Sequence, residues 1–197
     1  DIKSAPRTQP YTDGSPFRKE VLSGLTVQDH LYRMLLANEK DSTYALARSV
    51  FGNTASAVKK MNEVTMDICG TDPTFGDIYG EISGSFLITD LAKLIDAMLA
   101  EPLLNKIWCA SSYTVPATQE LVYSTNALLV GNPTGYHGIA QDSRVTGGLT
   151  SVSGDYADMA VTAEYQGKRV LCILTGALRI THPYEDDPNS FSVVDYW

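Results

Sequence analysis

The spacing of apolar residues changes from a helical period in the first half of the chain to strand-like alternation in the second half. A helix is expected directly after Thr26, because Thr26 and Asp29 have the spacing of a capping box. The apolar positions that would share one face of this helix are Val27, Leu31, Met34 and Leu35. This pattern is that of an amphipathic helix.

Further helices are expected before the sequence changes character. One begins at Asp41, and another runs from Thr54 to a stop near Gly70. A later helix begins with Thr89 as its cap and ends at Pro102. Its apolar stripe consists of Leu91, Leu94, Ile95, Met98 and Leu99. The intervening segment TDPTFGDIYGEISGS has several glycines and no helical stripe, which indicates a loop.

The second half is expected to form an antiparallel sheet. Its β-prone runs are SSYTV (111–115), STNALLV (124–130), RVTGGLTS (144–151), YADMAVTAEY (156–165) and KRVLCILTGA (168–177). Gln166 and Gly167 form a hairpin connection between the last two runs. The last run is apolar on both faces, so helices or loops are expected to cover both. The order of elements indicates a mixed α/β (α+β) fold, with helices stacked against one antiparallel sheet.

Composition fits one globular unit. The 197 residues are 44% hydrophobic and 19% charged, which favours a single core over disorder. Residues 1–22 are polar and rich in Pro and Gly, so we expect an extended arm followed by one domain over residues 23–197. A net charge of −8 without a basic patch disfavours nucleic acid and anionic membranes as partners. No stretch has the pattern of a membrane span or of a secretory leader.

The sequence has no pattern for a metal or a cofactor. Its cysteines and histidines are Cys69, Cys109, Cys172, His30, His137 and His182. Neither set has the paired spacing of a zinc site, and a Cys-His nucleophile pair could form only through the fold. There is also no Walker loop and no dinucleotide fingerprint. We therefore expect no metal and no cofactor.

Several ordered blocks carry a resemblance to a known family. LTVQDHLYRMLLANEKDSTYALA (25–47) matches without a gap a segment that normally reads roughly LTVEDLLYALLLPSGNDAAYALA. VKKMNEV (58–64), SYTVPAT (112–118), VTG (145–147) and the following hairpin come in the same order. In these blocks the chain resembles the D-alanyl-D-alanine carboxypeptidases, a family of low-molecular-mass penicillin-binding proteins. The resemblance implies a β-lactamase/transpeptidase-like fold, in which the family's N-terminal strands and nucleophile helix have no counterpart in this chain.

By this resemblance, acyl transfer would require three motifs. A Ser-x-x-Lys on a helix supplies the nucleophile and its base, because a serine hydroxyl is a weak nucleophile alone. A Ser-x-Asn on an interhelical loop relays a proton and holds the substrate. A Lys-Thr-Gly on an edge strand binds the terminal carboxylate, while its backbone pairs with the peptide. Preorganised donors for the oxyanion complete the requirement.

The only Ser-x-x-Lys in the sequence is Ser56 to Lys59, and its position argues against a catalytic role. The two side chains would share a helical face, but they follow the region of the second motif, where the family has an ordinary helix. By the resemblance, the nucleophile should precede Leu25, where nothing has this spelling. We therefore interpret the pair as structural and assign no catalytic residue.

The positions of the second motif hold Asn38, Glu39 and Lys40. The spelling Ser-Thr-Asn occurs at residues 124–126, where the family has the segment leading into Asn-x-Leu-Leu, and is interpreted as structural. Lys40 brings a cation close to the expected cleft. An ammonium can bind a carboxylate, but it cannot replace a hydroxyl and an amide together. Asn38 and Lys40 are therefore candidate substrate-binding residues.

The third motif keeps Thr146 and Gly147 but has Val145 in place of its lysine. Gly147 allows close approach of another backbone, so peptide pairing along this edge strand is conceivable. Arg144 would point to the opposite face of the strand, unless a bulge turned it. Thr146 and Gly147 are the other two candidate substrate-binding residues. The alternative is a strand that keeps Thr-Gly for packing.

These departures lead to one hypothesis and two alternatives. We expect a carboxypeptidase-family domain that associates with peptidoglycan stem peptides and is noncatalytic on its own. One alternative is an active serine-type D-Ala-D-Ala carboxypeptidase whose nucleophile segment lies outside this chain. The other is a structural or protein-interaction domain. By the resemblance, we expect an extracytoplasmic setting, a missing N-terminal segment or second chain as partner, and an unpaired sheet edge or exposed apolar patch.

Overall fold

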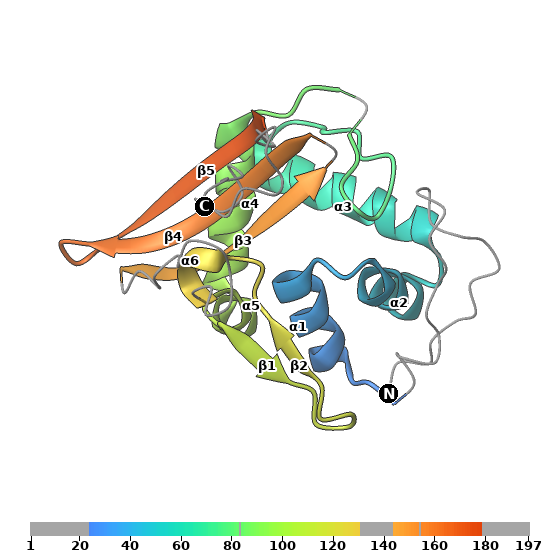
Figure 1. The fold of residues 1–197 in the computed structure, drawn as a ribbon. Helices are drawn as coiled ribbons and strands as arrows, with labels where there is room; N and C mark the ends of the chain where they lie inside the picture. Colours follow the sequence, from blue (N-terminus) through green and yellow to red (C-terminus); the bar gives the residue numbers. More distant parts are fainter. Residues whose placement is uncertain (1–23, 83, 131–143, 154, 179–197) are drawn as a thin grey trace.

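The structure is a computed structural model that describes residues 24–82, 84–130, 144–153 and 155–178. These residues form a helical cluster, a three-stranded antiparallel sheet and a two-stranded ribbon (Figure 1). The helices are α1 (Val27–Ala37), α2 (Lys40–Phe51), α3 (Thr54–Cys69), α4 (Ile88–Ala100), α5 (Pro102–Trp108) and α6 (Ala127–Val130). The strands are β1 (Ser112–Thr114), β2 (Leu121–Tyr123), β3 (Val145–Ser153), β4 (Tyr156–Tyr165) and β5 (Lys168–Leu178). The expected α+β fold is confirmed, whereas the expected arm at 1–22 lies outside the described residues.

The start of α1 has the capping box that the sequence predicts. The Thr26 hydroxyl accepts from the Asp29 backbone N–H at 3.2 Å, and the Asp29 carboxylate accepts from the Thr26 N–H at 2.7 Å. The predicted apolar face is confirmed in part, because Leu31 and Leu35 pack against an apolar cluster, whereas Val27 is 48% exposed. The buried residues of α1 are Asp29, His30, Tyr32, Arg33 and Leu36. A largely polar face can be buried here because its side chains find partners on other elements.

The next two helices lie close to their predicted positions. α2 begins at Lys40, one residue before the expected start. α3 has the expected limits, and the Asn53 side chain accepts from the Ser56 N–H at 2.7 Å as its cap. Gly70 ends α3 in a left-handed conformation with φ of 75°. These limits come from local signals, which is why the sequence could predict them.

The helices around Pro102 differ in part from expectation. α4 begins at Ile88 with Leu87 in the capping position, so the prediction of Thr89 as the cap is wrong. α4 does end before Pro102, but Pro102 then opens α5, a helix that the sequence analysis did not predict. Proline at the first helical position loses no hydrogen bond, so the same residue ends one helix and starts the next.

The run STNALLV was predicted as a strand, and this prediction is wrong. Its second half forms the short helix α6, where the Asn126 side chain accepts from the Leu128 N–H at 3.1 Å. An asparagine cap favours a helix start over a strand. The predicted strand at SSYTV is present as β1, and its partner β2 was not predicted. Together β1 and β2 form a ribbon that packs against α1.

β4 is the central strand of the sheet, in the order β3-β4-β5. The β4–β5 hairpin closely follows the predicted limits, with Gln166 and Gly167 at φ of 51° and 72° in the connection. β3 pairs antiparallel with β4, and the register shifts between Val145 and Gly147 as at a β-bulge. Among the described strands, β3 has only β4 as a partner, so it is an edge strand.

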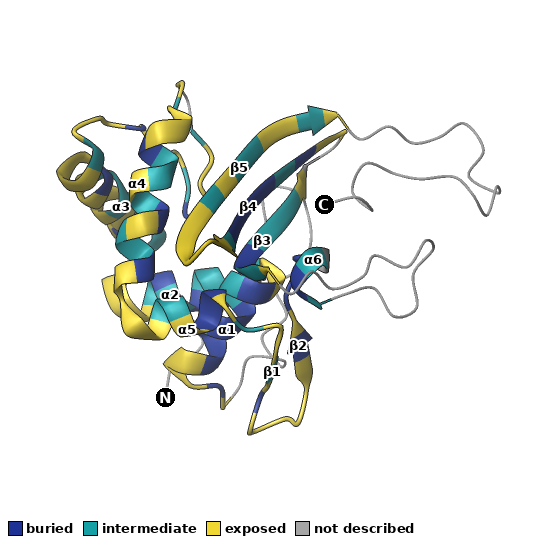
Figure 2. Cartoon of the chain, turned by 90° about the vertical axis from the view of Figure 1, so that its left-hand side faces the viewer, coloured by how far each residue is buried: buried dark blue, intermediate teal, exposed yellow. Residues whose placement is uncertain are grey.

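β5 differs from its prediction. Its apolar run led to the expectation of cover on both faces, but none of its residues is buried (Figure 2). Val170 and Leu178 are 47% and 56% exposed. The reason is that β5 is the last strand of the described sheet, and the apolar cluster around α4 includes only its residues Leu171 and Ile173.

α5 connects two of the three apolar clusters found among the described residues. The first cluster contains Leu25, Tyr32, Leu36, Ala45, Ile107, Val115 and Val122. The second contains Ile95, Leu99, Trp108 and Ala160. Because Ile107 and Trp108 are adjacent residues of α5, this short helix joins the α1 region to the sheet. Trp108 is thereby fixed against β3, where it shapes the candidate site.

We predict that the described edge of β5 promotes self-association or binding of another chain, because an edge strand with exposed apolar side chains offers backbone groups for pairing. Val170→Lys should reduce association in analytical ultracentrifugation. Val27→Lys is a matched control, since Val27 lies on a helix and is 48% exposed, close to the 47% of Val170. A well-behaved monomer of the unaltered chain, with no fragment bound, would contradict this prediction.

Candidate functional site

The first residues of β3 contain the Thr-Gly pair identified in the sequence. The Thr146 hydroxyl donates to the Thr162 hydroxyl on β4 at 3.1 Å. The indole N–H of Trp108 donates to the same Thr162 oxygen at 2.8 Å. Thr162 is only 1% exposed, so these three side chains form an internal connection between α5, β3 and β4. The Thr146 hydroxyl therefore has a structural partner.

The two glycines after Thr146 are required by packing. A Cβ atom at Gly147 would lie 2.6 Å from the backbone oxygen of Trp108 and 2.8 Å from its indole nitrogen. At Gly148, φ is 139° and a Cβ atom would lie 2.5 Å from the Ala160 carbonyl oxygen. The close approach that Gly147 allows is thus an approach by Trp108 of the same chain.

Farther along β3, both backbone groups of Thr150 are hydrogen-bonded outside the sheet. The Thr150 N–H donates to the Thr125 hydroxyl at 3.0 Å, and the Thr150 hydroxyl donates to the Thr125 carbonyl at 2.6 Å. The Thr150 carbonyl accepts from the Asn38 side-chain amide at 2.8 Å. Thr125 also donates its backbone N–H to the Leu36 carbonyl at 2.9 Å. The end of α1 is therefore connected to β3 directly and through Thr125.

The two other candidate residues are Asn38 in the loop between α1 and α2 and Lys40 at the start of α2. Asn38 has φ of 52° and ψ of 36°, a left-handed conformation that asparagine tolerates. Its side chain reaches β3, as described for Thr150. The Lys40 ammonium lies 5.7 Å from the ring centroid of Tyr79, within the range of a cation–π interaction. The loop thus directs an amide to the strand, and the start of α2 directs a cation to the 71–85 segment.

Behind this loop lies a polar network formed by His30, Arg33, Glu39, Ser42 and Glu120, in which His30, Arg33 and Ser42 are buried. Arg33 donates from Nε and Nη2 to the two carboxylate oxygens of Glu39, at 2.5 and 2.7 Å. Its Nη1 donates to Glu120 at 2.5 Å. Ser42 donates to Glu39 at 2.7 Å. These hydrogen bonds raise the pKa of Arg33 above its usual value, with Glu39 as the main cause and burial as a smaller opposing effect.

His30 completes the network from within α1. It is 0% exposed, and its Nδ1 lies 3.2 Å from the Ser42 hydroxyl oxygen. Because Ser42 gives its proton to Glu39, we assign the imidazole proton to Nδ1, which then donates to Ser42. Burial lowers the pKa of His30, with Arg33 adding to the effect and Glu39 opposing it. Ser42 is also 0% exposed, so this Ser-His pair is structural and out of reach of a substrate.

Sequence reasoning missed the polar network, although a signal was present. Four of its members stand where the family segment quoted above has Leu, Ala, Gly and Ala. These members are His30, Arg33, Glu39 and Ser42. His30 and Arg33 are three residues apart on α1, a spacing that places two side chains on one helical face. Polar residues that replace apolar or small ones at such a spacing indicate a buried network.

Asp29 connects the start of α1 to β1. The Tyr113 hydroxyl donates to the Asp29 carboxylate at 2.6 Å, and the Tyr113 ring stacks on Tyr32 with centroids 3.8 Å apart. Burial alone would raise the pKa of Asp29, but the hydrogen bonds from Tyr113 and Thr26 outweigh it and lower that pKa. The pKa of Tyr113 rises to about 12, because of burial and the bond to Asp29.

The two displaced motif spellings lie on α3 and beside β3. Ser56 is an exposed residue of α3, and Lys59 is 80% exposed, with its ammonium 3.9 Å from Glu63. Ser124 donates to the Gly148 carbonyl at 3.4 Å. Asn126 is 0% exposed and donates to the Gly147 carbonyl at 3.5 Å. The 124–126 segment therefore supports β3 from outside the sheet.

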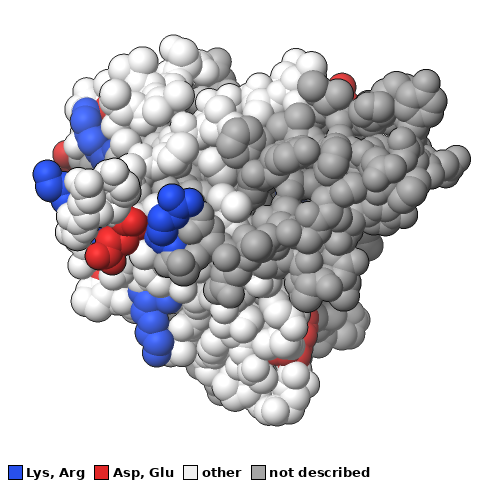
Figure 3. Space-filling model, turned by 60° about the vertical axis from the view of Figure 1, so that its left-hand side comes forward, with Lys and Arg blue, Asp and Glu red and all other residues white. Residues whose placement is uncertain are grey.

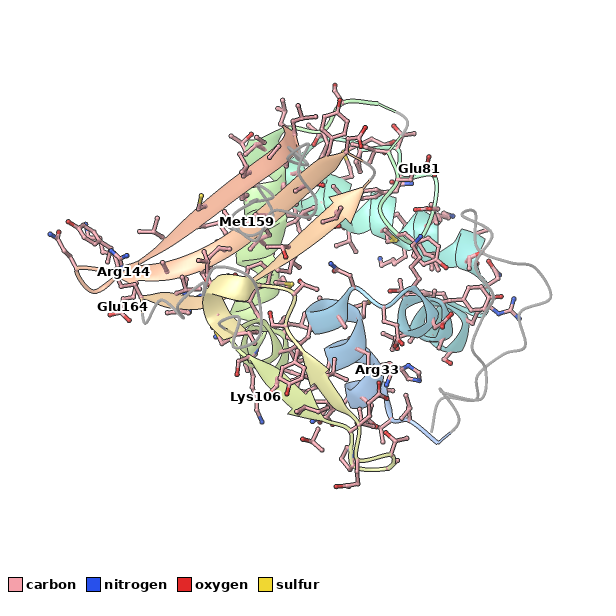
Figure 4. All side chains as sticks on the ribbon, in the orientation of Figure 1. Arg33, Glu81, Lys106, Arg144, Met159 and Glu164 are labelled. Carbon is pink, nitrogen blue, oxygen red and sulfur yellow. The ribbon has the colours of Figure 1, made fainter. Side chains whose placement is uncertain are left out.

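The structure brings the four candidate substrate-binding residues to different points. Thr146 and Gly147 lie at the start of β3, whereas Asn38 meets the strand at Thr150, about 10 Å farther along at ~3.3 Å per residue. Lys40 is directed to Tyr79. The neighbouring arginine, Arg144, lies beside Glu164 at the projecting end of the sheet, away from α1 and Arg33 (Figure 4).

Charge and metal chemistry add little to the site. On the face in Figure 3, basic and acidic side chains of the described residues are interspersed. Within the described residues, no group of three or more His, Cys, Asp or Glu side chains could hold a metal ion. In the same part of the chain, no helix combines the length and apolarity needed to cross a bilayer.

Comparison with known proteins identifies the fold. No protein-family model and no curated protein matches the sequence. Among solved structures, penicillin-binding protein 6B from Escherichia coli aligns with 83% of this chain at 21% identity and a TM-score of 0.59. PBP3 from Streptococcus pneumoniae, a peptidoglycan synthesis regulatory factor, aligns with 81% at 20% identity and a TM-score of 0.62. The D-alanyl-D-alanine carboxypeptidase DacD from Francisella tularensis aligns with 82% at 15% identity and a TM-score of 0.60.

The described residues therefore have the fold of the low-molecular-mass penicillin-binding proteins, and the sequence resemblance is confirmed at the level of the fold. The alignments cover 56%, 49% and 53% of these three chains. This chain thus spans about half the length of each of these relatives.

We predict that Gly147→Ala destabilises the protein by about 1–3 kcal/mol, because the added methyl group overpacks the contact with Trp108. Gly84→Ala is the control, since a Cβ atom there would meet nothing within 4 Å. Denaturant unfolding of both variants measures the difference. Equal stability of the two variants would show that Gly147 is not required for packing.

A pH dependence follows from buried His30. Because burial lowers the pKa of His30 below its ordinary value of 6.5, the unfolded chain takes up the proton first as the pH falls. The contribution of neutral His30 to the free energy of unfolding should therefore be fully present above pH 6.5. Below pH 6.5 the free energy of unfolding should decrease, by at most ~1.4 kcal/mol per pH unit. The lowered pKa of Asp29 acts separately, below 3.8.

His30→Leu should abolish the His30 contribution. Urea unfolding between pH 7.5 and 5 measures it, and the other histidines are common to both proteins. If the variant keeps the pH slope of the unaltered chain, the slope arises elsewhere.

Proposed function

We propose that this chain is a noncatalytic domain with the carboxypeptidase fold that associates with peptidoglycan stem peptides. One observation carries the noncatalytic part. The loop between α1 and α2 presents the Asn38 amide to β3, where the family's chemistry would need a hydroxyl that relays a proton. An amide N–H donates a hydrogen bond but does not act as an acid or base at neutral pH. The loop can therefore position a ligand without transferring a proton.

The other motif positions support the same proposal. Val145 supplies no cation, and Thr146 donates its hydroxyl to Thr162. Ser56 and Lys59 lie exposed on α3, where the Lys59 ammonium faces Glu63. Neither the strand nor the Ser56 pair provides the activated serine that nucleophilic attack requires.

Association with a stem peptide is supported by the cation and the strand edge that remain. A stem peptide ends in a carboxylate, for which the ammonium of Lys40, the first residue of α2, is a suitable partner. β3 lies at the edge of the described sheet, where an extended peptide can add as a further strand. The names of two relatives, a D-alanyl-D-alanine carboxypeptidase and a peptidoglycan synthesis regulatory factor, support this substrate class.

The setting of this function would be outside the cytoplasm, where peptidoglycan lies. A further partner in the proposal is an N-terminal segment or second chain that pairs with β5. The exposed Val170 and Leu178 on that strand support such a partner.

A protein-interaction domain is the second candidate. The observation that favours it is that Thr150 uses both of its backbone groups within the molecule. The backbone of Thr150 is then not available to pair with a peptide, which shortens the part of β3 that could bind one. In this case the site would bind no stem peptide, and the exposed side of β5 would be the functional surface.

Titration with a stem peptide ending in D-Ala-D-Ala tests the proposal. Isothermal titration calorimetry should detect binding, and Lys40→Ala should weaken it about tenfold through loss of a charge-assisted hydrogen bond. Lys59→Ala is the matched control, because Lys59 lies 80% exposed on α3 and should not affect binding. Absence of binding by the unaltered chain would refute the stem-peptide role and favour the interaction domain.

Fluorescent penicillin tests the noncatalytic part separately, because covalent labelling requires a serine that is acylated. We expect no labelling of this chain. Labelling of the chain would establish an active serine enzyme.

A further inference from the structure

The outer edge of β3 is occupied by side chains of the same molecule. Thr150 lies opposite Met159 in the register, yet its N–H binds Thr125 and its C=O binds Asn38. An edge strand accepts an added peptide through the backbone N–H and C=O groups that point away from its neighbouring strand. At Thr150, the places of an added strand are thus already taken.

We propose that the hydrogen bond from Asn38 to Thr150 is an autoinhibitory contact, which closes this part of β3 to an extended peptide. The polar network holds the loop that carries Asn38 in this closed position. The proposal rests on the proposed function, because a stem peptide is the ligand that the edge would otherwise accept. A side-chain amide can close the edge because it offers the same N–H donor as a peptide backbone.

The local conformation of the loop directs Asn38 to the strand. Asn38 ends α1 in the left-handed region, with φ of 52°. The chain then turns away into α2, which begins at Lys40. The reach of the Asn38 side chain to Thr150 therefore depends on the placement of the two-residue connection, Asn38 and Glu39.

Glu39 fixes this connection. Its carboxylate accepts two bonds from Arg33 on α1 and one from Ser42 on α2. Its side chain is 12% exposed and that of Arg33 is 3% exposed, so removal of either partner would leave a poorly solvated charge. The residue next to Asn38 is thus held by charge-assisted bonds from the helices on both sides of the loop.

The difference in strength between these bonds explains how the edge could open. Asn38 is exposed, so water competes for its bond to Thr150. The bonds of Glu39 are charged and largely shielded from water. A peptide N–H would therefore displace Asn38 from the Thr150 carbonyl while the loop stays in place and the Thr150 N–H keeps its bond to Thr125.

Asn38→Ala tests the contact without a change to the buried network. We expect this variant to bind a D-Ala-D-Ala stem peptide about three- to tenfold more tightly, the factor that one exposed hydrogen bond supplies. Gln119→Ala is a matched control with unchanged affinity. Gln119 is also exposed, has φ of 58° and donates its amide to a backbone carbonyl, that of Pro116, at 2.8 Å.

The outcomes separate this inference from the proposed function. Equal or weaker binding by Asn38→Ala, with binding by the unaltered chain, would overturn the autoinhibitory contact and leave the stem-peptide role intact. Absence of binding by both proteins would overturn both proposals. Tighter binding by both Asn38→Ala and Gln119→Ala would show a general loosening and would also overturn the specific contact.

Glu39→Gln tests whether the polar network holds the loop that carries Asn38 in the closed position. NMR signals of the Asn38 side-chain amide should move to the position of a free, solvated amide in this variant, with no ligand present. Glu120→Gln is the matched control. It removes the charge of the other carboxylate that Arg33 binds, and Glu120 lies outside the loop. If the Asn38 signals respond equally to both variants, or to neither, Glu39 does not hold the closed position.

Discussion

The buried ion pair between Arg33 and Glu39 is the interaction on which the candidate site depends. A guanidinium that is 3% exposed needs partners for its charge, and Glu39 and Glu120 supply them. These two carboxylates come from the α1–α2 loop and from the residue before β2. One cation therefore fixes the loop relative to the ribbon. The polar face of α1 is a consequence, because it is buried against charge and hydrogen-bond partners rather than against apolar side chains alone.

A second constraint on β3 is its packing against Trp108 of α5. Trp108 leaves no room for a side chain at Gly147, and its indole shares the Thr162 hydroxyl with Thr146. The Thr-Gly pair is thus explained by packing within the chain. The loop and the strand then meet at the hydrogen bond from Asn38 to Thr150. A penicillin-binding-protein fold is retained, while residues at the motif positions now make internal contacts.

Some local signals in the sequence predicted the local structure, although the predictions of the Thr89 cap and of the strand at STNALLV were wrong. The capping box at Thr26, the glycine at the end of α3 and the β4–β5 hairpin each depend on neighbouring residues, and all three are confirmed. The polar face of α1 could not be predicted in this way, because Arg33 finds Glu120 87 residues farther along the chain. The exposure of β5 could not be predicted for the same reason, because the cover of a strand depends on elements elsewhere in the chain. The motif comparison named Asn38, but its partner Thr150 is 112 residues away and follows only from the fold.

The central proposal is that this chain has the penicillin-binding-protein fold but no serine that a β-lactam acylates. A crystal structure of this chain after soaking in a β-lactam tests it most directly, because the bond that an active serine forms is an ester visible in the electron density. We predict that no continuous density joins the β-lactam to a side chain and that Asn38 is still in contact with Thr150. An ester between the β-lactam and any side chain of this polypeptide would contradict the account.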